Sequence, residues 1–112
     1  MAYFKGSKNT MSVIGHLGAD AQTKPAGKSQ VTTFKVATNL ITGKGEKAKE
    51  KTIWIPCELW GENEVAKFLK KGQLVSVEAF YDASSVEGEG DEKKYFHSFK
   101  VDSIILLGKK KD

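Results

Sequence analysis

Both tryptophans of this 112-residue chain lie in one short segment, residues 52–61. Side chains alternate between the two faces of a β-strand, so Trp54 and Trp60 share one face, about 20 Å apart along an extended strand. The alternate positions, which include Ile53 and Cys57, are small or apolar and are predicted to face a core. An exposed indole stacks on any nucleobase, which predicts a platform for a single strand, worth about 1–3 kcal/mol per base. A subunit contact is the other common use of such side chains.

The residues that could hold phosphates are lysines. The 18 basic residues include no arginine, they exceed the 14 acids to give a net charge of +4, and the pI is about 9.1. Lysine lacks the planar fork with which arginine reads a guanine edge, so we expect backbone tracking rather than sequence readout. Strand parity places Lys35 outward beside Thr33. Lys49 and Lys51 are expected in a mobile hairpin loop over residues 43–51, from which they would reach a bound strand.

The sequence offers little for catalysis. His16 and His97 are far apart, no His/Cys spacing suggests zinc, and His97 is expected to be partly buried. Cys57 has core parity, which argues against a nucleophile. The segment 82–92 holds five acids and no base and is predicted to be a solvated hairpin loop, within a loop over residues 84–94. We therefore expect no enzymatic activity, no metal and no cofactor.

Period-2 alternation, with β-branched and aromatic residues, predicts five strands. They cover residues 11–18, 30–39, 52–61, 74–81 and 95–107. One short helix is predicted between the third and fourth strands. It starts at Asn63 as N-cap, carries an apolar stripe of Val65, Phe68 and Leu69, and stops at Gly72. This order, in an all-β chain with one short helix, is that of a five-stranded OB-fold barrel.

Length and cysteine content set the expected organisation. Residues 1–108 are predicted to form a single OB-fold domain, and residues 109–112 a disordered basic tail. One cysteine cannot form an internal disulfide, so we expect a cytoplasmic protein. No run approaches the roughly 20 apolar residues that a membrane helix requires, so no membrane association is expected.

Five segments resemble bacterial-type single-stranded DNA-binding proteins, in the same order along the chain. The resemblance spans residues 9–108, and the ordered set is more specific than any one motif. MSVIGHLGAD resembles the first strand of that family, and FKVAT the second. LWG, with the tryptophan before it, resembles the third, VAKFLKKG the helix and its stop, and VSVE the fourth. These segments are residues 11–20, 34–38, 59–61, 65–72 and 75–78.

The resemblance implies an OB-fold that wraps single-stranded DNA during replication, recombination and repair, as a homo-oligomer, either dimer or tetramer. Trp54 and Trp60 match stacking positions of the family. Two further stacking positions fall near Thr42 and Val86, which are not aromatic. Phe80 and Phe96 are outward by parity and are expected to compensate. With an acidic hairpin and no arginine, we expect weaker and more salt-sensitive binding than in the family.

The family often ends in an acidic tip that recruits partner enzymes, whereas this chain is similar to a compact member without such a tail, so recruitment of that kind is not supported. Two other functions fit the same residues. An OB-fold protein-interaction or primosome-like module would turn its tryptophans towards protein. A binder that prefers RNA would share nearly every feature of a DNA binder.

Overall fold

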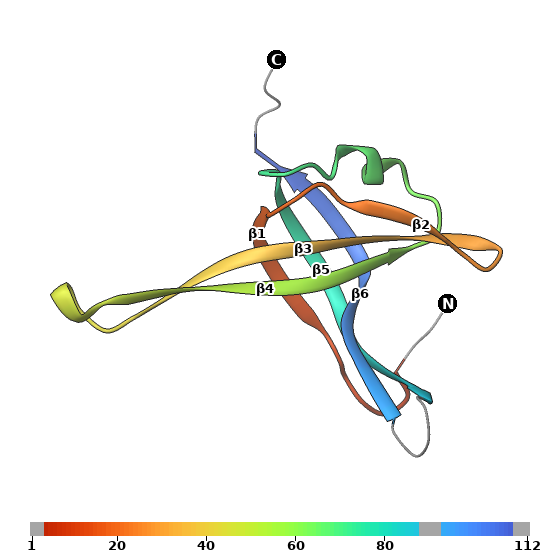
Figure 1. Ribbon diagram of the computed structural model, residues 1–112, viewed down its shortest axis with the longest axis horizontal. Helices are drawn as coiled ribbons and strands as arrows, with labels where there is room; N and C mark the ends of the chain where they lie inside the picture. The colour runs from red at the N-terminus through yellow and green to blue at the C-terminus, as the bar shows by residue number, and fades with distance from the viewer. Residues whose placement is uncertain (1–3, 88–92, 109–112) are drawn as a thin grey trace.

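The computed structural model describes residues 4–87 and 93–108 of the chain. Six strands and two short 3-10 helices follow one another in this part (Figure 1). The elements are β1 (Met11–Leu17), β2 (Gln22–Ala26), β3 (Ser29–Thr42), η1 (Gly45–Lys47), β4 (Lys49–Trp60), η2 (Glu64–Phe68), β5 (Leu74–Glu87) and β6 (Lys93–Leu107).

Five of these strands close a barrel. They are hydrogen-bonded in the order β1-β5-β6-β4-β3, and β1 returns to β3 at His16 and Leu17 to complete the ring. All contacts are antiparallel except that of β4 with β6, where Cys57 lies opposite Phe99. The predicted five-stranded OB-fold barrel is therefore confirmed. The prediction missed β2, which pairs with the outer edge of β3 and takes no part in the closure.

A glycine allows β1 to cross β3 where the barrel closes. A Cβ atom at Gly15 would lie 2.2 Å from the backbone oxygen of Ala37. Carbon and oxygen cannot approach so closely, so any side chain here would push the two strands apart. The Gly-His-Leu-Gly run of the first strand thus places a residue without a side chain at the crossing.

The core follows the alternation of the strands. In β3, Thr32, Phe34 and Val36 are buried while Lys35 between them is exposed, and in β5 Val75 and Val77 are fully buried. The hydroxyl of Thr32 is hydrogen-bonded to that of Thr23, 2.9 Å away, so its burial leaves no polar atom unpaired. The predicted inward face of β4 is confirmed at Cys57 and Leu59, which are buried. It is wrong at Ile53, which is exposed because β4 there leaves the barrel for the arm.

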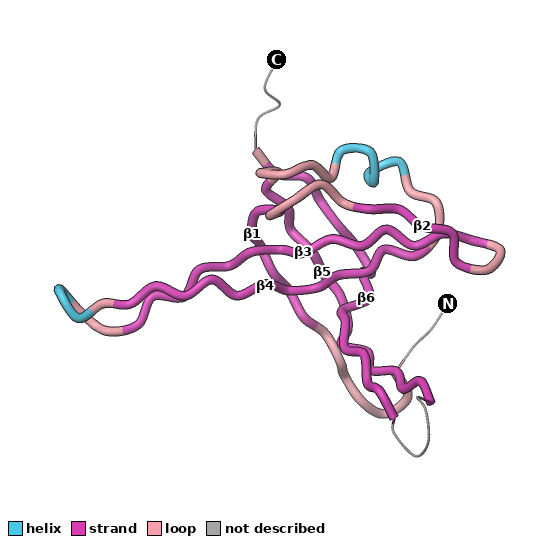
Figure 2. The backbone as a smooth tube through the Cα atoms, viewed as in Figure 1, coloured by secondary structure: helices cyan, strands magenta, loops and turns pink. Residues whose placement is uncertain are grey.

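The predicted hairpin loop over residues 43–51 is confirmed except at its end, where residues 49–51 already belong to β4, and the one over residues 84–94 is strand at 84–87 and 93–94. β3 and β4 pair from Val31 with Trp60 out to Thr42 with Lys49, so the hairpin extends beyond the barrel as a two-stranded arm that ends at η1 (Figures 1 and 2). β5 and β6 likewise pair as far as Glu87 and Lys93. Polar composition indicated loops, but backbone pairing in a ribbon needs no apolar face, and cross-strand partners such as Asn39 and Thr52 bond to each other. Residues 88–92 of the predicted acidic loop lie outside the described part.

The predicted helix is reduced to the five residues of η2 (Figure 2). Its start is as expected, because the side chain of Asn63 accepts a hydrogen bond from the amide of Val65 at 2.9 Å. The apolar stripe is wrong at Phe68, which is 47% exposed, whereas Leu69 just past the end is 1% exposed and enters the core. Val65 packs against the core, so the stripe is confirmed at Val65 and Leu69 but not at Phe68. Gly72 has the left-handed backbone that was predicted, with a φ of 89°, but the helix has already ended at Phe68.

None of the helices in residues 4–87 and 93–108 is long and apolar enough to cross a membrane. The predicted tail, residues 109–112, lies outside the described residues.

Candidate nucleic-acid interface

The outward face of the β3–β4 pair carries both tryptophans. The register sets Trp54 opposite Ala37 and Trp60 opposite Val31, with Lys35 between them, opposite Pro56. The indoles are 52% and 50% exposed although both belong to a well-paired strand. The predicted arrangement, two tryptophans on one open face with a lysine between, is what the register produces.

Trp54 rests on a glycine of the segment that follows β1. A Cβ atom added to Gly18 would lie 2.2 Å from Cζ3 and 2.6 Å from Cη2 of the indole. The ring therefore covers the space that any side chain at this position would occupy. Gly18 does not need a left-handed backbone, so its role here is to let the indole lie close to the barrel. The second glycine of the Gly-His-Leu-Gly run thus positions an aromatic residue 36 positions away in the sequence.

A groove of about 930 Å³ runs along this face. Its walls come from the segment between β1 and β2 and the first residue of β2, from β3 and β4, and from the hairpin of β5 with β6. It brings together five of the residues predicted to bind nucleic acid, namely Trp54, Trp60, Lys35, Thr33 and Phe96. Lining residues not predicted to bind include Gly18, Glu58, Asp82, His97, Ser98 and Lys100.

The far end of the groove is a polar cluster around Trp60. The indole Nε1 donates to Oε1 of Glu58 at 3.4 Å, and the hydroxyl of Ser98 donates to the same oxygen at 3.0 Å. The Lys100 ammonium lies 5.5 Å from the centroid of the indole. Trp60 is thus held at its edge by a carboxylate and faced by a cation, an arrangement that favours a fixed ring orientation.

Lys100 is also held by an acid. Its Nζ lies 2.7 Å from Oδ2 of Asp82 on the neighbouring strand, with both side chains about one third exposed. The hydrogen bond from Lys100 lowers the pKa of the Asp82 carboxyl below its ordinary value. A phosphate that enters here must compete with this carboxylate for the ammonium group. Among residues 4–87 and 93–108, Lys35 is the lysine of the groove that forms no ion pair.

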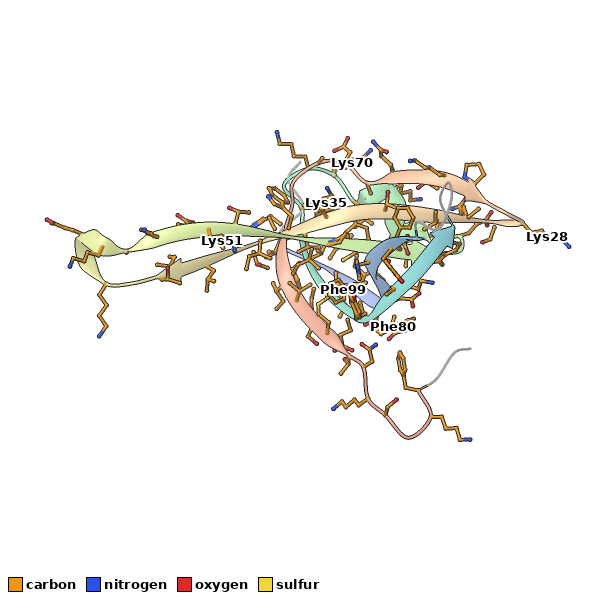
Figure 3. The ribbon with its side chains drawn as sticks, turned by 60° about the horizontal axis from the view of Figure 1, so that its bottom comes forward. Lys28, Lys35, Lys51, Lys70, Phe80 and Phe99 are labelled. Carbon is orange, nitrogen blue, oxygen red and sulfur yellow. The ribbon has the colours of Figure 1, made fainter. Side chains whose placement is uncertain are left out.

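The two lysines expected from the loop lie elsewhere. Lys49 and Lys51 are strand residues of the arm, paired with Thr42 and Leu40. They alternate with Trp54, so the pleat puts them on the opposite face of the ribbon, and neither lines the groove. Figure 3 shows Lys51 on the arm and Lys35 over the barrel. The loop prediction was wrong about their backbone, and parity within β4 was the signal that could have corrected it.

The two compensating phenylalanines have different surroundings. Phe96 is 57% exposed and lines the groove. Phe80 is half-buried, because the ring of Phe4 packs edge-on against it with 5.3 Å between centroids, and it does not line the groove. The N-terminal segment is held there by the Asn9 side chain, which makes two hydrogen bonds to the backbone of Tyr81, of 2.8 and 2.9 Å.

His97 differs from its prediction. It is exposed and lines the groove, its ring stacks on that of Tyr81, and Nδ1 is hydrogen-bonded to the tyrosine hydroxyl. The inward parity is correct nearer the barrel, where Phe99 packs against the core. The β5–β6 hairpin extends past the barrel, so the same parity at its outer end leads to solvent.

Sequence reasoning missed Ser98 and Lys100 as residues of the groove. Both share the parity of Phe96, which was assigned outward, so the same alternation would have found them. In the sheet, Lys100 lies opposite Glu58 in the parallel β4–β6 pair. That pairing joins residues 42 positions apart and has no local signal in the sequence.

Cys57 lies in the floor of the groove but is buried, and burial raises the pKa of its thiol to about 12. Such a thiol stays protonated and is a poor nucleophile. Within the described ranges, no group of three or more His, Cys, Asp or Glu residues could hold a metal ion.

Comparison with known proteins shows the family to which this barrel belongs. The model of the single-strand binding protein family matches residues 8–107. The chain belongs to the single-strand binding protein family. The predicted resemblance is thereby confirmed over nearly its full extent.

Relatives within this family include two bacterial proteins. Single-stranded DNA-binding protein 3 of Listeria innocua is 30% identical over 110 residues, which are 93% of this chain and 66% of that protein. Single-stranded DNA-binding protein 1 of Xylella fastidiosa is 32% identical over 111 residues, 95% of this chain and 82% of the relative. This single-strand binding family member therefore spans about two thirds to four fifths of their lengths.

A solved structure shares the fold. The Plasmodium falciparum SSB, in complex with ssDNA, superposes with a TM-score of 0.78 at 23% identity, over 95% of this chain and 100% of that one. The OB-fold assignment of this single-strand binding family member thus stands on both its strand order and this likeness.

Proposed function

We propose that this chain binds single-stranded DNA nonspecifically with respect to sequence, and protects it in replication, recombination and repair. The observation that carries the proposal is the open groove in which Trp54 and Trp60, each about half exposed, flank Lys35. Membership of the single-strand binding protein family, and the DNA-bound relative of the same fold, support it.

Binding would rest on stacking and on a small number of phosphate contacts. Trp54, Trp60 and Phe96 offer three aromatic faces in one groove, each worth about 1–3 kcal/mol when a base stacks on it. Lys35 and Lys100 are the cations that reach the groove, and Lys100 is shared with Asp82. Lys49 and Lys51 would contact only a strand that continues over the arm. Because few lysines reach the groove, we now expect affinity to depend less steeply on salt than the all-lysine composition suggested.

The test is a titration with oligo(dT) at two salt concentrations, followed by tryptophan fluorescence. Binding should quench the emission, and raising the salt should reverse it. The double variant Trp54→Ala/Trp60→Ala, followed with a labelled oligonucleotide, should lose at least tenfold in affinity, about 1.4 kcal/mol. Lys28→Ala is the matched control for charge, because that lysine lies in the β2–β3 turn outside the groove (Figure 3). Unchanged affinity of the double variant would refute stacking.

The alternatives have distinct outcomes in the same experiment. An interaction module would show no binding to any oligonucleotide at low salt. A binder that prefers RNA would bind oligo(rU) more tightly than oligo(dU). Membership of the single-strand binding protein family, and the DNA-bound relative of the same fold, favour the nucleic-acid function over the interaction module.

We further propose that the chain acts in the cytoplasm as a homo-oligomer, dimer or tetramer. Ile14 and Ile105 are about 60% exposed and lie on either side of Ser76, in a row across β1, β5 and β6. Two large apolar side chains exposed near one another on the outside of a barrel favour a contact between proteins. Light scattering would measure the mass, and Ile14→Lys should lower it.

A further inference from the structure

A carboxylate in a groove for a polyanion calls for an explanation. Glu58 lies at the centre of the β4 face between Pro56 and Trp60, and it is half-buried. Its negative charge opposes the approach of phosphates, and no lysine forms an ion pair with it in the part of the chain that the structure describes. Electrostatics alone would favour a neutral residue or a lysine at this position.

The carboxylate is held in place by two neutral donors. The Trp60 indole and the Ser98 hydroxyl both donate to Oε1. Among residues 4–87 and 93–108, no hydrogen bond to Oε2 is formed. An ionised carboxylate accepts about four hydrogen bonds, so Glu58 retains acceptor capacity. An indole N–H lies in the ring plane, which puts the carboxylate at the edge of the ring on which a base would stack.

We propose that Glu58 gives the groove a base preference, accepting a hydrogen bond from the exocyclic amine of the base stacked on Trp60. This inference rests on the proposed single-strand binding. Among pyrimidines, cytosine offers its N4 amine to such an acceptor, and uracil and thymine offer a carbonyl oxygen at the same position, which the carboxylate repels. The groove thus prefers cytosine over uracil or thymine beside Trp60, while the remaining contacts stay indifferent to the base.

Charge does not account for this preference. Oligonucleotides of equal length carry equal numbers of phosphates, so the repulsion between Glu58 and the backbone weakens binding of all of them alike. Only a contact to the base edge distinguishes them. A purely positioning role, in which Glu58 orients the Trp60 ring, also acts on every base equally.

The experiment compares oligo(dC) with oligo(dU) of the same length, at pH 8, on wild type and on Glu58→Gln. The two bases differ at the 4-position, an amine in cytosine and a carbonyl oxygen in uracil, and at N3, which accepts a hydrogen bond in cytosine and donates one in uracil. The glutamine amide both donates and accepts, so it serves either base. The quantity measured is the ratio of the two dissociation constants, dU over dC, in each protein. Intrinsic differences in stacking and flexibility between the oligonucleotides cancel when the wild-type ratio is divided by the variant ratio.

We expect this quotient to be about fivefold or more, the effect of one good contact to a base edge. Glu46→Gln, the same change at a carboxylate of η1 that does not line the groove, should leave the ratio as in wild type. A quotient near one, with both oligonucleotides bound by wild type, would overturn the preference and leave single-strand binding intact. If wild type bound neither oligonucleotide, the proposed function would fail and the preference with it.

Discussion

The contact between Gly18 and Trp54 gives a sharp test of the proposed interface. A methyl group at Gly18 would overlap the indole, with 2.2 Å between Cβ and Cζ3 where carbon atoms in contact lie about 3.5–4.0 Å apart. The ring must therefore move by at least about 1.3 Å, which spoils its overlap with a base. If half of a stacking energy of about 1–3 kcal/mol is lost, Gly18→Ala weakens binding about 2- to 12-fold.

The assay is fluorescence anisotropy of a labelled oligo(dT), measured on Gly18→Ala, on Trp54→Ala and on the double variant. Trp54→Ala should weaken binding more than Gly18→Ala. In the double variant, Gly18→Ala should add nothing, within about 0.5 kcal/mol, because the ring that it displaces is gone. Additive losses, or a Gly18→Ala protein that binds as tightly as wild type, would refute the view that Gly18 acts through Trp54.

Further predictions concern the barrel, one ion pair and one thiol. Gly15→Ala should lower the free energy of unfolding by about 1–3 kcal/mol, because the added methyl group meets the backbone of Ala37, whereas at Gly18 it meets a ring that can move. Chemical denaturation would measure both free energies of unfolding. Equal stability of Gly15→Ala and Gly18→Ala would contradict this reasoning. In an NMR titration, the pKa of the Asp82 carboxyl should lie below its ordinary value, and in Lys100→Met it should return towards that value. The ion pair should therefore stabilise the fold at pH values above the ordinary carboxyl pKa. This stabilisation should be lost as the pH falls through the lowered pKa of Asp82. Cys57 should not react with a thiol reagent at pH 8 until the protein is unfolded, because burial raises its pKa to about 12; rapid labelling of the native protein would show that the thiol is accessible.

The candidate site was predictable where it follows one strand. Alternation within β4 placed both tryptophans outward and Cys57 inward, and alternation within β3 placed Lys35 outward. Each of these statements needs only the pleat of a strand and a decision about which face is apolar. The same rule, extended along β4, would have removed Lys49 and Lys51 from the groove, had their segment been recognised as strand.

Prediction failed where a polar segment forms regular structure. The arm of β3 with β4 has no core to cover, so its composition resembles that of a loop, yet its backbone groups pair across to Thr42 and Lys49. The prediction of a longer helix failed for a different reason. Leu69 enters the core from just beyond a single 3-10 turn, and nothing local distinguishes that turn from a longer α-helix.

The sequence by itself determined where the five barrel strands lie along the chain, which face of the third barrel strand the two tryptophans occupy, and the family. These depend on local periodicity and on motifs that a single chain displays. Only the tertiary structure decided what shares the groove with Trp60. Glu58 and Lys100 meet across the parallel β4–β6 pair, Asp82 reaches Lys100 from β5, and Gly18 underlies Trp54. Such contacts join residues far apart in the chain, and barrel closure sets their register.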